Sequence, residues 1–431
     1  MFVRTLFLGS DRKANFVIGN GFGRATAMME GVIALLSTVL HGIYIILPAA
    51  SLGAFAFRGR PWLKRTIAGA WISGSILAAA VLAAYVMAIG GSASYLQIGM
   101  AIYFGVALML LLKLVDALFR RAIGRVFKID RPDTKRSTLA LAMVLRVVVF
   151  GAFALPWVMS AVMVYRPRVQ PDETPGSILR VEYEAVTFPA RDGTRIAGWY
   201  VPAKTASPVT VLLCHGLGAS KSGMWSILRG LHEADVNVLT IDLRAHGYSG
   251  GNLTTFGAKE PDDVLGAIDW LRLHHVEDSD RIVGVGASLG AAALIDAAAR
   301  DVRIDAVVSI GTFDSFSTLA SEISEQHMVP PISWLTQAMA LPMASLHAGV
   351  DLSSISPGDH IADIWPRPVM IVHGANDEII PFAHGKRLYD KAFSPRESVF
   401  TGGTHNGVLD DPAIVARIVE FVLHAQPVPV I

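Results

Sequence analysis

The sequence has little charge and almost no cysteine. Only 17% of its 431 residues are charged and 52% are hydrophobic, whereas about a quarter of the residues in an average soluble domain are charged. With a mean hydropathy of +0.46, this composition excludes a disordered chain and an ordinary soluble protein. The single cysteine, Cys214, excludes an intramolecular disulfide and a metal site built from several cysteines.

Acidic residues are scarce in the first part of the chain. Residues 1–165 hold 17 of the 37 Lys and Arg residues but only 5 of the 36 Asp and Glu residues. The net charge of +1 therefore conceals a basic part followed by an acidic part. Because the basic residues lie in clusters between long apolar runs, the pattern indicates membrane topology and no nucleic-acid partner.

Four apolar runs in the basic part are each long enough to cross a lipid bilayer, which takes about 20 residues per helix. Four such runs in succession predict a helical, multi-pass membrane domain over residues 1–165. The runs are Ala27–Phe57, Thr66–Gly90, Tyr95–Phe119 and Thr138–Tyr165.

The loops between these runs differ in positive charge. Loops 58–65 and 120–136 carry four and seven Lys and Arg residues, and the opposite side carries six in total. Because positive loops stay in the cytoplasm, we expect the rest of the chain on the non-cytoplasmic side. The four positive residues of the amino-terminal tail weaken this assignment, and the orientation reverses if the first run is a re-entrant or interfacial helix.

The chain after the fourth run begins with a proline-rich segment. Residues 166–180 are predicted to be a linker, extended over Arg166–Pro175. Residues 181–431 then alternate between strands and helical patterns, which predicts an α/β domain with a mainly parallel sheet covered on both faces. The predicted strands are Val181–Phe188, Arg195–Val201, Val209–Cys214, Val236–Ile241, Arg281–Val285, Ile304–Ile310, Val369–Val372 and Ser398–Thr401, with a helix at Pro261–His275.

A G-x-S-x-G motif stands between a predicted strand and an alanine-rich helix. It reads Gly286-Ala-Ser-Leu-Gly290 and directly follows the strand Arg281–Val285. A strand-to-helix turn this tight strains the backbone of Ser288 and raises its hydroxyl above the sheet, as a catalytic nucleophile requires. The alternative is that Ser288 caps the helix.

An acid and a histidine follow Ser288 in the chain order that this motif requires. Asp377 lies after the strand Val369–Val372, and His405 lies in the glycine-rich loop after the last strand. His405 is predicted to act as the general base, and Asp377 to fix its tautomer and stabilise the imidazolium. Glu378 is the alternative acid.

Two backbone amides are the predicted donors for the oxyanion of an acyl-transfer reaction. The N–H of Leu217 follows the strand Val209–Cys214, and the N–H of Leu289 follows Ser288.

With these motifs, residues 181–431 resemble an α/β-hydrolase, and more narrowly its serine aminopeptidase and monoacylglycerol-lipase-like branch. The resemblance implies a doubly wound, mainly parallel sheet with a small cap. It also implies that Arg244 and His246 belong to a structural loop beside the site. It rests on Asp192-Gly193, His215-Gly216, Asp242-Leu-Arg-Ala-His-Gly-Tyr-Ser-Gly250, Gly286-Ala-Ser-Leu-Gly290, His373-Gly-Ala-Asn-Asp377 and His405.

The segment between the strands ending at Ile310 and starting at Val369 is longer than one crossover helix needs. Residues 312–365 are therefore predicted to be a cap insertion whose side chains Phe313, Trp334 and Met339 line a substrate pocket. The alternative is a helix packed on the sheet.

The sequence as a whole predicts a membrane-anchored serine hydrolase. It would cleave ester, thioester or amide bonds through an acyl-serine intermediate, on lipid-derived acyl substrates, with no metal and no cofactor. An acyltransferase with the same three residues is one alternative. A non-catalytic membrane scaffold or binding protein that keeps the fold is another.

Overall fold

The computed structural model describes residues 67–76, 105–106, 109–110, 113, 160, 163–166, 168–327 and 332–426. Nearly all of the four predicted membrane runs lie outside the described residues, so the membrane domain stays a prediction. Within the described ranges, no helix combines the length and the apolar character needed to cross a membrane.

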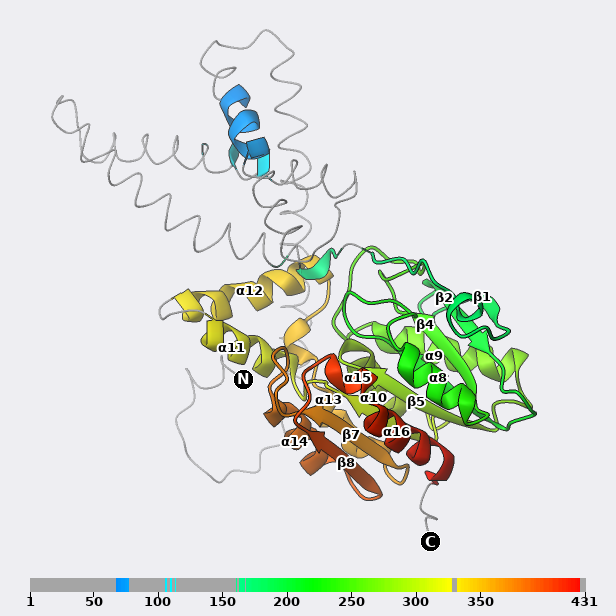
Figure 1. Ribbon diagram of the computed structural model, residues 1–431. Helices are drawn as coiled ribbons and strands as arrows, with labels where there is room; N and C mark the ends of the chain where they lie inside the picture. The colour runs from blue at the N-terminus through cyan, green and yellow to red at the C-terminus, as the bar shows by residue number, and fades with distance from the viewer. Residues whose placement is uncertain are drawn as a thin grey trace, which may run out of the picture.

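The described carboxy-terminal part forms an α/β domain around one sheet (Figure 1). The sheet has eight strands among the described residues, in the order β1-β2-β4-β3-β5-β6-β7-β8. β1 and β2 pair antiparallel, as do β2 and β4, and the other neighbours pair parallel. The strands are β1 Glu184–Pro189, β2 Arg195–Val201, β3 Val209–Cys214, β4 Asn237–Asp242, β5 Arg281–Ala287, β6 Ala306–Ile310, β7 Val369–Gly374 and β8 Arg396–Thr401.

This topology confirms the predicted mainly parallel sheet. The strands β2 and β3 have the predicted bounds, whereas β1 begins three residues later than expected, at Glu184, and β4 runs one residue later, over Asn237–Asp242. The central strands are almost fully buried, because helices cover both faces of the sheet.

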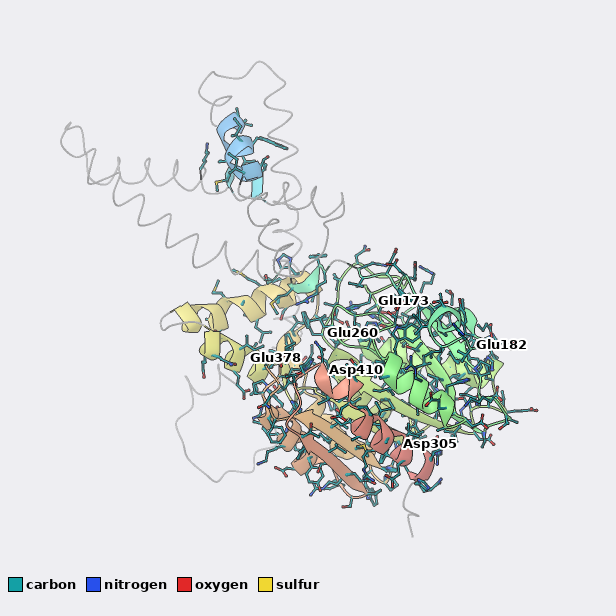
Figure 2. The ribbon with its side chains drawn as sticks, viewed as in Figure 1. Glu173, Glu182, Glu260, Asp305, Glu378 and Asp410 are labelled. Atoms are coloured by element: carbon teal, nitrogen blue, oxygen red, sulfur yellow. The ribbon has the colours of Figure 1, made fainter. Side chains whose placement is uncertain are left out.

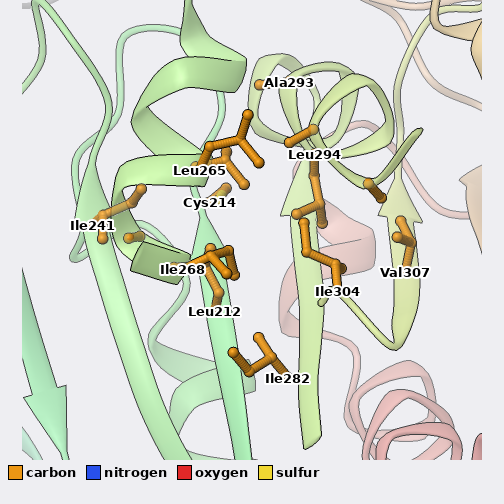
Figure 3. Close-up of a cluster of buried hydrophobic side chains, with 14 of the residues drawn as sticks. Leu212, Cys214, Ile241, Leu265, Ile268, Ile282, Ala293, Leu294, Ile304 and Val307 are labelled. Atoms are coloured by element: carbon orange, nitrogen blue, oxygen red, sulfur yellow. The ribbon is translucent and has the colours of Figure 1, made fainter. Parts of the chain in front are cut away.

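Two hydrophobic clusters lie on opposite faces of the sheet. Leu212 belongs to the cluster under α9 (Glu260–His274), α10 (Leu289–Arg300) and α14 (Phe382–Lys391), part of which Figure 3 shows. The next residue, Leu213, belongs to the cluster under α8 (Trp225–Glu233) and α16 (Pro412–His424). Successive strand side chains therefore enter opposite layers, as the pleat requires. The remaining short elements are α7 Pro175–Ile178, α13 Pro357–His360, α15 Gly407–Asp410, η2 Leu352–Ser354 and η3 Ile361–Ile364.

The predicted linker lies against the α/β domain. The guanidinium of Arg168 donates hydrogen bonds to the carbonyls of Ser249 and Gly251. Further along, the Thr174 side chain accepts a hydrogen bond from the N–H of Ser177 and caps α7. The stretch predicted to be extended, Arg166–Pro175, ends where α7 begins. The contact of Arg168 had no signal in the sequence, because proline content gives no information about where a charged side chain finds acceptors.

The predicted insertion between β6 and β7 divides into two parts. The helices α11 (Phe316–His327) and α12 (Ile332–Ala348) pack on each other, and Figure 1 shows them beside the body of the domain. The elements α13 and η3 instead pack against α10, which covers the sheet. The segment therefore consists of a helical pair, α11 and α12, and of short elements that pack on α10, and its role as a cap stays a prediction.

Candidate active site

The turn between β5 and α10 holds Ser288 in a strained backbone conformation. β5 ends at Ala287 and α10 begins at Leu289, and the φ and ψ of Ser288 are 50° and −114°. Residues other than glycine rarely adopt positive φ, and such strain costs on the order of 1–3 kcal/mol. Two hydrogen bonds hold the turn: the Ser288 N–H donates to the Ile310 carbonyl at 2.8 Å, and the Thr312 hydroxyl donates to the Ser288 carbonyl at 2.7 Å.

The two glycines of the motif leave room for this turn. A Cβ at Gly286 would lie 2.6 Å from backbone atoms of Ala291, and a Cβ at Gly290 would lie 2.2 Å from the carbonyl oxygen of Cys214. Neither contact can be relieved by a side-chain rotation, because the opposing atoms are backbone. The Ser288 side chain makes no capping hydrogen bond, so the helix-cap interpretation of this serine has no support in the structure.

Asp377 and His405 form a buried pair at the carboxyl ends of neighbouring strands. Asp377 follows β7 and His405 follows β8, and His405 Nδ1 lies 2.7 Å from Asp377 Oδ2. Their side chains are 0% and 9% exposed. Because a carboxylate can only accept, this contact puts the proton on Nδ1 and leaves Nε2 of the neutral ring able to accept one.

The other oxygen of the Asp377 carboxylate is held by the backbone. Its Oδ1 accepts the N–H groups of Ile379 and Ile380 at 2.9 and 2.8 Å. Burial alone would raise the pKa of Asp377, but the hydrogen bonds from His373, His405 and Ile380 outweigh it and hold the pKa well below its usual value. The carboxylate is therefore charged whenever the protein is folded near neutral pH.

Glu378, the alternative acid, has a different position. Its Oε2 accepts the backbone N–H of His405 at 3.3 Å, and its side chain is labelled in Figure 2. Asp377, and not Glu378, thus contacts the imidazole ring.

Ser288 and the Asp377–His405 pair converge on the end of β6. A Cβ at Gly311 would lie 3.5 Å from His405 ring atoms and 3.6 Å from Asp377 Oδ2. The preceding residue, Ile310, accepts the N–H of Ser288. Among the hydrogen bonds of the described residues none joins the Ser288 hydroxyl to His405, and catalytic hydrogen bonds often form only when substrate binds.

The loop after β3 lies beside Ser288. A Cβ at Gly216 would lie 3.3 Å from Ser288 Cβ, so this loop passes close to the serine. In the described part of the chain, the N–H groups of Leu217 and Leu289 donate to no protein acceptor. Within the described residues, no hydrogen bond therefore occupies either of the predicted oxyanion donors.

Two buried histidines fix the loop that carries Leu217. His246 Nε2 accepts the N–H of Gly218 at 3.1 Å. His215 Nε2 accepts the N–H of Leu243 at 3.1 Å, and its Nδ1 lies 2.7 Å from the Gly216 carbonyl. Burial and the neighbouring His246 lower the pKa of His215 to about 3, which keeps its ring neutral. The family resemblance implied that His246 belongs to a structural loop, but nothing in the sequence indicated that its ring would contact Gly218.

The predicted pocket residues have three different outcomes. Phe313 is buried in a hydrophobic cluster with residues of α11, α12 and the 253–258 segment, and Leu217 packs against that cluster. Met339 is half-buried on α12 and is not among the residues of this cluster. The side chain of Trp334 lies outside the described residues.

A search of the described residues finds no group of three or more His, Cys, Asp or Glu side chains that could hold a metal ion.

Comparisons with known proteins cover this same domain. A model of the alpha/beta hydrolase family matches residues 211–418. Protein YfhR of Escherichia coli strain K12 is 30% identical over 252 residues, which cover 56% of this chain and 81% of YfhR. Human alpha/beta hydrolase domain-containing protein 17B is 25% identical over 232 residues, covering 53% of this chain and 72% of the human protein.

A solved structure matches the fold. The Pyrococcus furiosus esterase Pf2001 is 26% identical, with a TM-score of 0.53, and the match covers 61% of this chain and 98% of the esterase. Together with the eight-stranded sheet and the strained serine turn, these similarities show that the chain belongs to the alpha/beta hydrolase family.

Proposed function

We propose that this protein is a serine hydrolase that cleaves carboxylic ester, thioester or amide bonds through an acyl-serine intermediate. The observation that carries the proposal is the strained turn at Ser288 beside the hydrogen-bonded pair of Asp377 and His405. Similarity to a protein described as an esterase, Pf2001, supports ester substrates.

The proposed reaction uses the chain's own groups and water. The Ser288 hydroxyl attacks the carbonyl carbon of the substrate while Nε2 of His405 takes its proton. Asp377 stabilises the imidazolium, and the N–H groups of Leu217 and Leu289 bind the oxyanion. Collapse of the tetrahedral intermediate expels the alcohol, which receives the proton from His405. A water molecule then attacks the acyl-serine by the same steps and releases the acid.

We also propose that the protein is anchored in a lipid bilayer and acts on lipid-derived acyl substrates. The last residues of the fourth predicted run support this part. Val164 is fully buried in the cluster that contains Phe313, and its carbonyl accepts the N–H of Thr254 at 3.0 Å. The rings of Tyr165 and His347 on α12 pack edge to face, with their centroids 6.0 Å apart. The end of the fourth predicted run therefore packs in the same cluster as Phe313, against which Leu217 also packs.

Covalent labelling with a fluorophosphonate tests the proposed chemistry. The full chain should be labelled on Ser288, and Ser288→Ala should abolish both labelling and ester hydrolysis. Ser398→Ala, which removes an exposed hydroxyl from β8, is the matched control and should keep both. Unchanged hydrolysis by Ser288→Ala would refute the assignment of this serine.

A further inference from the structure

We propose that His373 is a positioning residue that holds the carboxylate of Asp377 in place for His405. This inference rests on the proposed function. His373 is the second-last residue of β7, four residues before Asp377, and its side chain is 0% exposed. Its Nε2 lies 3.0 Å from the carbonyl oxygen of Ile380 and 3.4 Å from Oδ2 of Asp377.

The contact with Ile380 assigns the tautomer of His373. A carbonyl oxygen can only accept, so the proton must be on Nε2. That N–H points to the Ile380 carbonyl and lies within reach of the carboxylate oxygen that also receives His405 Nδ1–H. His373 therefore spans the loop that carries Asp377, from the strand on one side to Ile380 on the other.

The other edge of the His373 ring is enclosed. Its Nδ1 is buried, and within the described residues it has no hydrogen-bond partner. A Cβ at Gly385 on α14 would lie 2.5 Å from this atom. The ring of Phe382 packs edge-on against the His373 ring, with the two ring centroids 5.9 Å apart. A second proton on Nδ1 would have no acceptor among the described residues, so the ring acts as a neutral donor through Nε2.

The titratable groups around Asp377 belong to β7, α14 and the loops that follow β7 and β8. His405 follows β8 and His373 belongs to β7. Glu378 binds the backbone N–H of His405. His384 on α14 is adjacent to Gly385, but its Nδ1 lies 2.5 Å from Asp314 Oδ1. A change at His373 should thus act on His405 mainly through the shared carboxylate.

Two substitutions at His373 distinguish the effect of losing the N–H donor from the effect of changing the side-chain volume. His373→Leu keeps a similar volume and removes the N–H, whereas His373→Gln offers an amide N–H near the position of Nε2. We expect His373→Leu to lower kcat about tenfold with little change in KM, because the variant loses both the hydrogen bond to Ile380 and the 3.4 Å contact with the Asp377 carboxylate. His373→Gln should recover most of kcat.

The pH profile gives a readout that a purely structural role would not move. Without the N–H of His373, the negative charge of Asp377 is less dispersed and binds the His405 imidazolium more tightly. Because His405 must be unprotonated to act as the base, the acid limb of the kcat/KM profile should move to higher pH in His373→Leu.

A third variant moves the ring without removing any functional group. In Gly385→Ala, the added methyl would push His373 away from its place, so kcat should fall and the acid limb should move in the same direction. Gly230→Ala is the matched control, because its methyl would also enter a helix contact, 2.7 Å from Val415 Cγ1 on α16. It should keep the wild-type profile.

The outcomes separate this inference from the proposed function. If the wild-type chain is not labelled by a fluorophosphonate, the proposed function fails. If the wild type is active and folded His373→Leu keeps its kcat and pH profile, the inference on His373 is wrong. Where His373→Leu does not fold, wild-type behaviour of Gly385→Ala would refute the inference instead.

Discussion

Asp377→Asn should inactivate the proposed hydrolase without disturbing its fold, for a reason that lies in the two oxygens of this carboxylate. Oδ1 accepts two backbone N–H groups, from Ile379 and Ile380. In the variant, the amide oxygen must take this place, because an NH₂ group there would face two donors. The NH₂ group then takes the place of Oδ2 and points toward His405 Nδ1.

This arrangement forces a change of tautomer in His405. Nδ1 must become the acceptor and Nε2 must carry the proton, so the ring can no longer take the proton of Ser288. The equivalent change in a serine protease lowers kcat about 10⁴-fold, or about 5 kcal/mol in the activation barrier. We expect a loss of this size here, measured as kcat on a soluble ester and as the rate of fluorophosphonate labelling.

Glu378→Gln provides the matched control for Asp377→Asn. Glu378 is exposed, and its one contact to the site is with the backbone N–H of His405, which an amide oxygen can also accept. Its kcat should stay within about threefold of the wild type. A wild-type rate in Asp377→Asn, or an equal loss in Glu378→Gln, would contradict the assignment of the acid.

Three further predictions concern topology, substrate and stability. A reporter fused after Ile431 should lie on the non-cytoplasmic side and one inserted near Lys128 on the cytoplasmic side; reversed signals would refute this orientation. In a series of p-nitrophenyl esters, kcat/KM should rise with chain length, each buried methylene contributing up to about 0.8 kcal/mol, and a maximum at acetate would contradict lipid-derived substrates. Hydrogen bonds from Arg303, opposed by burial, lower the pKa of Asp301 to about 2. The charged form of Asp301 therefore stabilises the fold above its unfolded pKa of about 3.9, and this contribution is lost as the pH falls toward 2. In chemical denaturation, the free energy of unfolding of Asp301→Asn should fall less over this pH range than that of the wild type.

The sequence was informative where one local pattern decides the structure. The motif at Gly286–Gly290 needs only a strand, a tight turn and a helix, and all three are encoded within about 20 neighbouring residues. The pairing of Asp377 with His405 could be expected because both follow strands of one parallel sheet, whose carboxyl ends meet at the same edge.

Contacts that depend on the packing of distant segments could not be predicted in this way. The tautomer of His373 depends on a carbonyl at Ile380 that the β7–α14 loop brings to it. Arg168 lies in a proline-rich stretch typical of a free linker, yet it binds carbonyls some 80 residues away. In both cases the hydrogen-bond acceptor is a backbone carbonyl. The type of an amino acid does not determine the direction of its backbone carbonyl, so the sequence could not predict these contacts.

The position of Ser288 in the sheet explains how the strained turn can persist. It follows β5, which is paired with β3 on one side and β6 on the other, so hydrogen bonds on both sides limit how far the strand end can move. The Ile310 carbonyl and the Thr312 hydroxyl bind the turn from the β6 side. Gly286 lets α10 pack closely on the end of β5, and Gly290 lets it approach the backbone at the end of β3. Strain of this kind persists only where surrounding contacts over-determine the conformation. An edge strand such as β8, which has one neighbouring strand within the described part of the sheet, would offer half of these constraints, and the central position of β5 therefore helps the strained turn at Ser288 to persist.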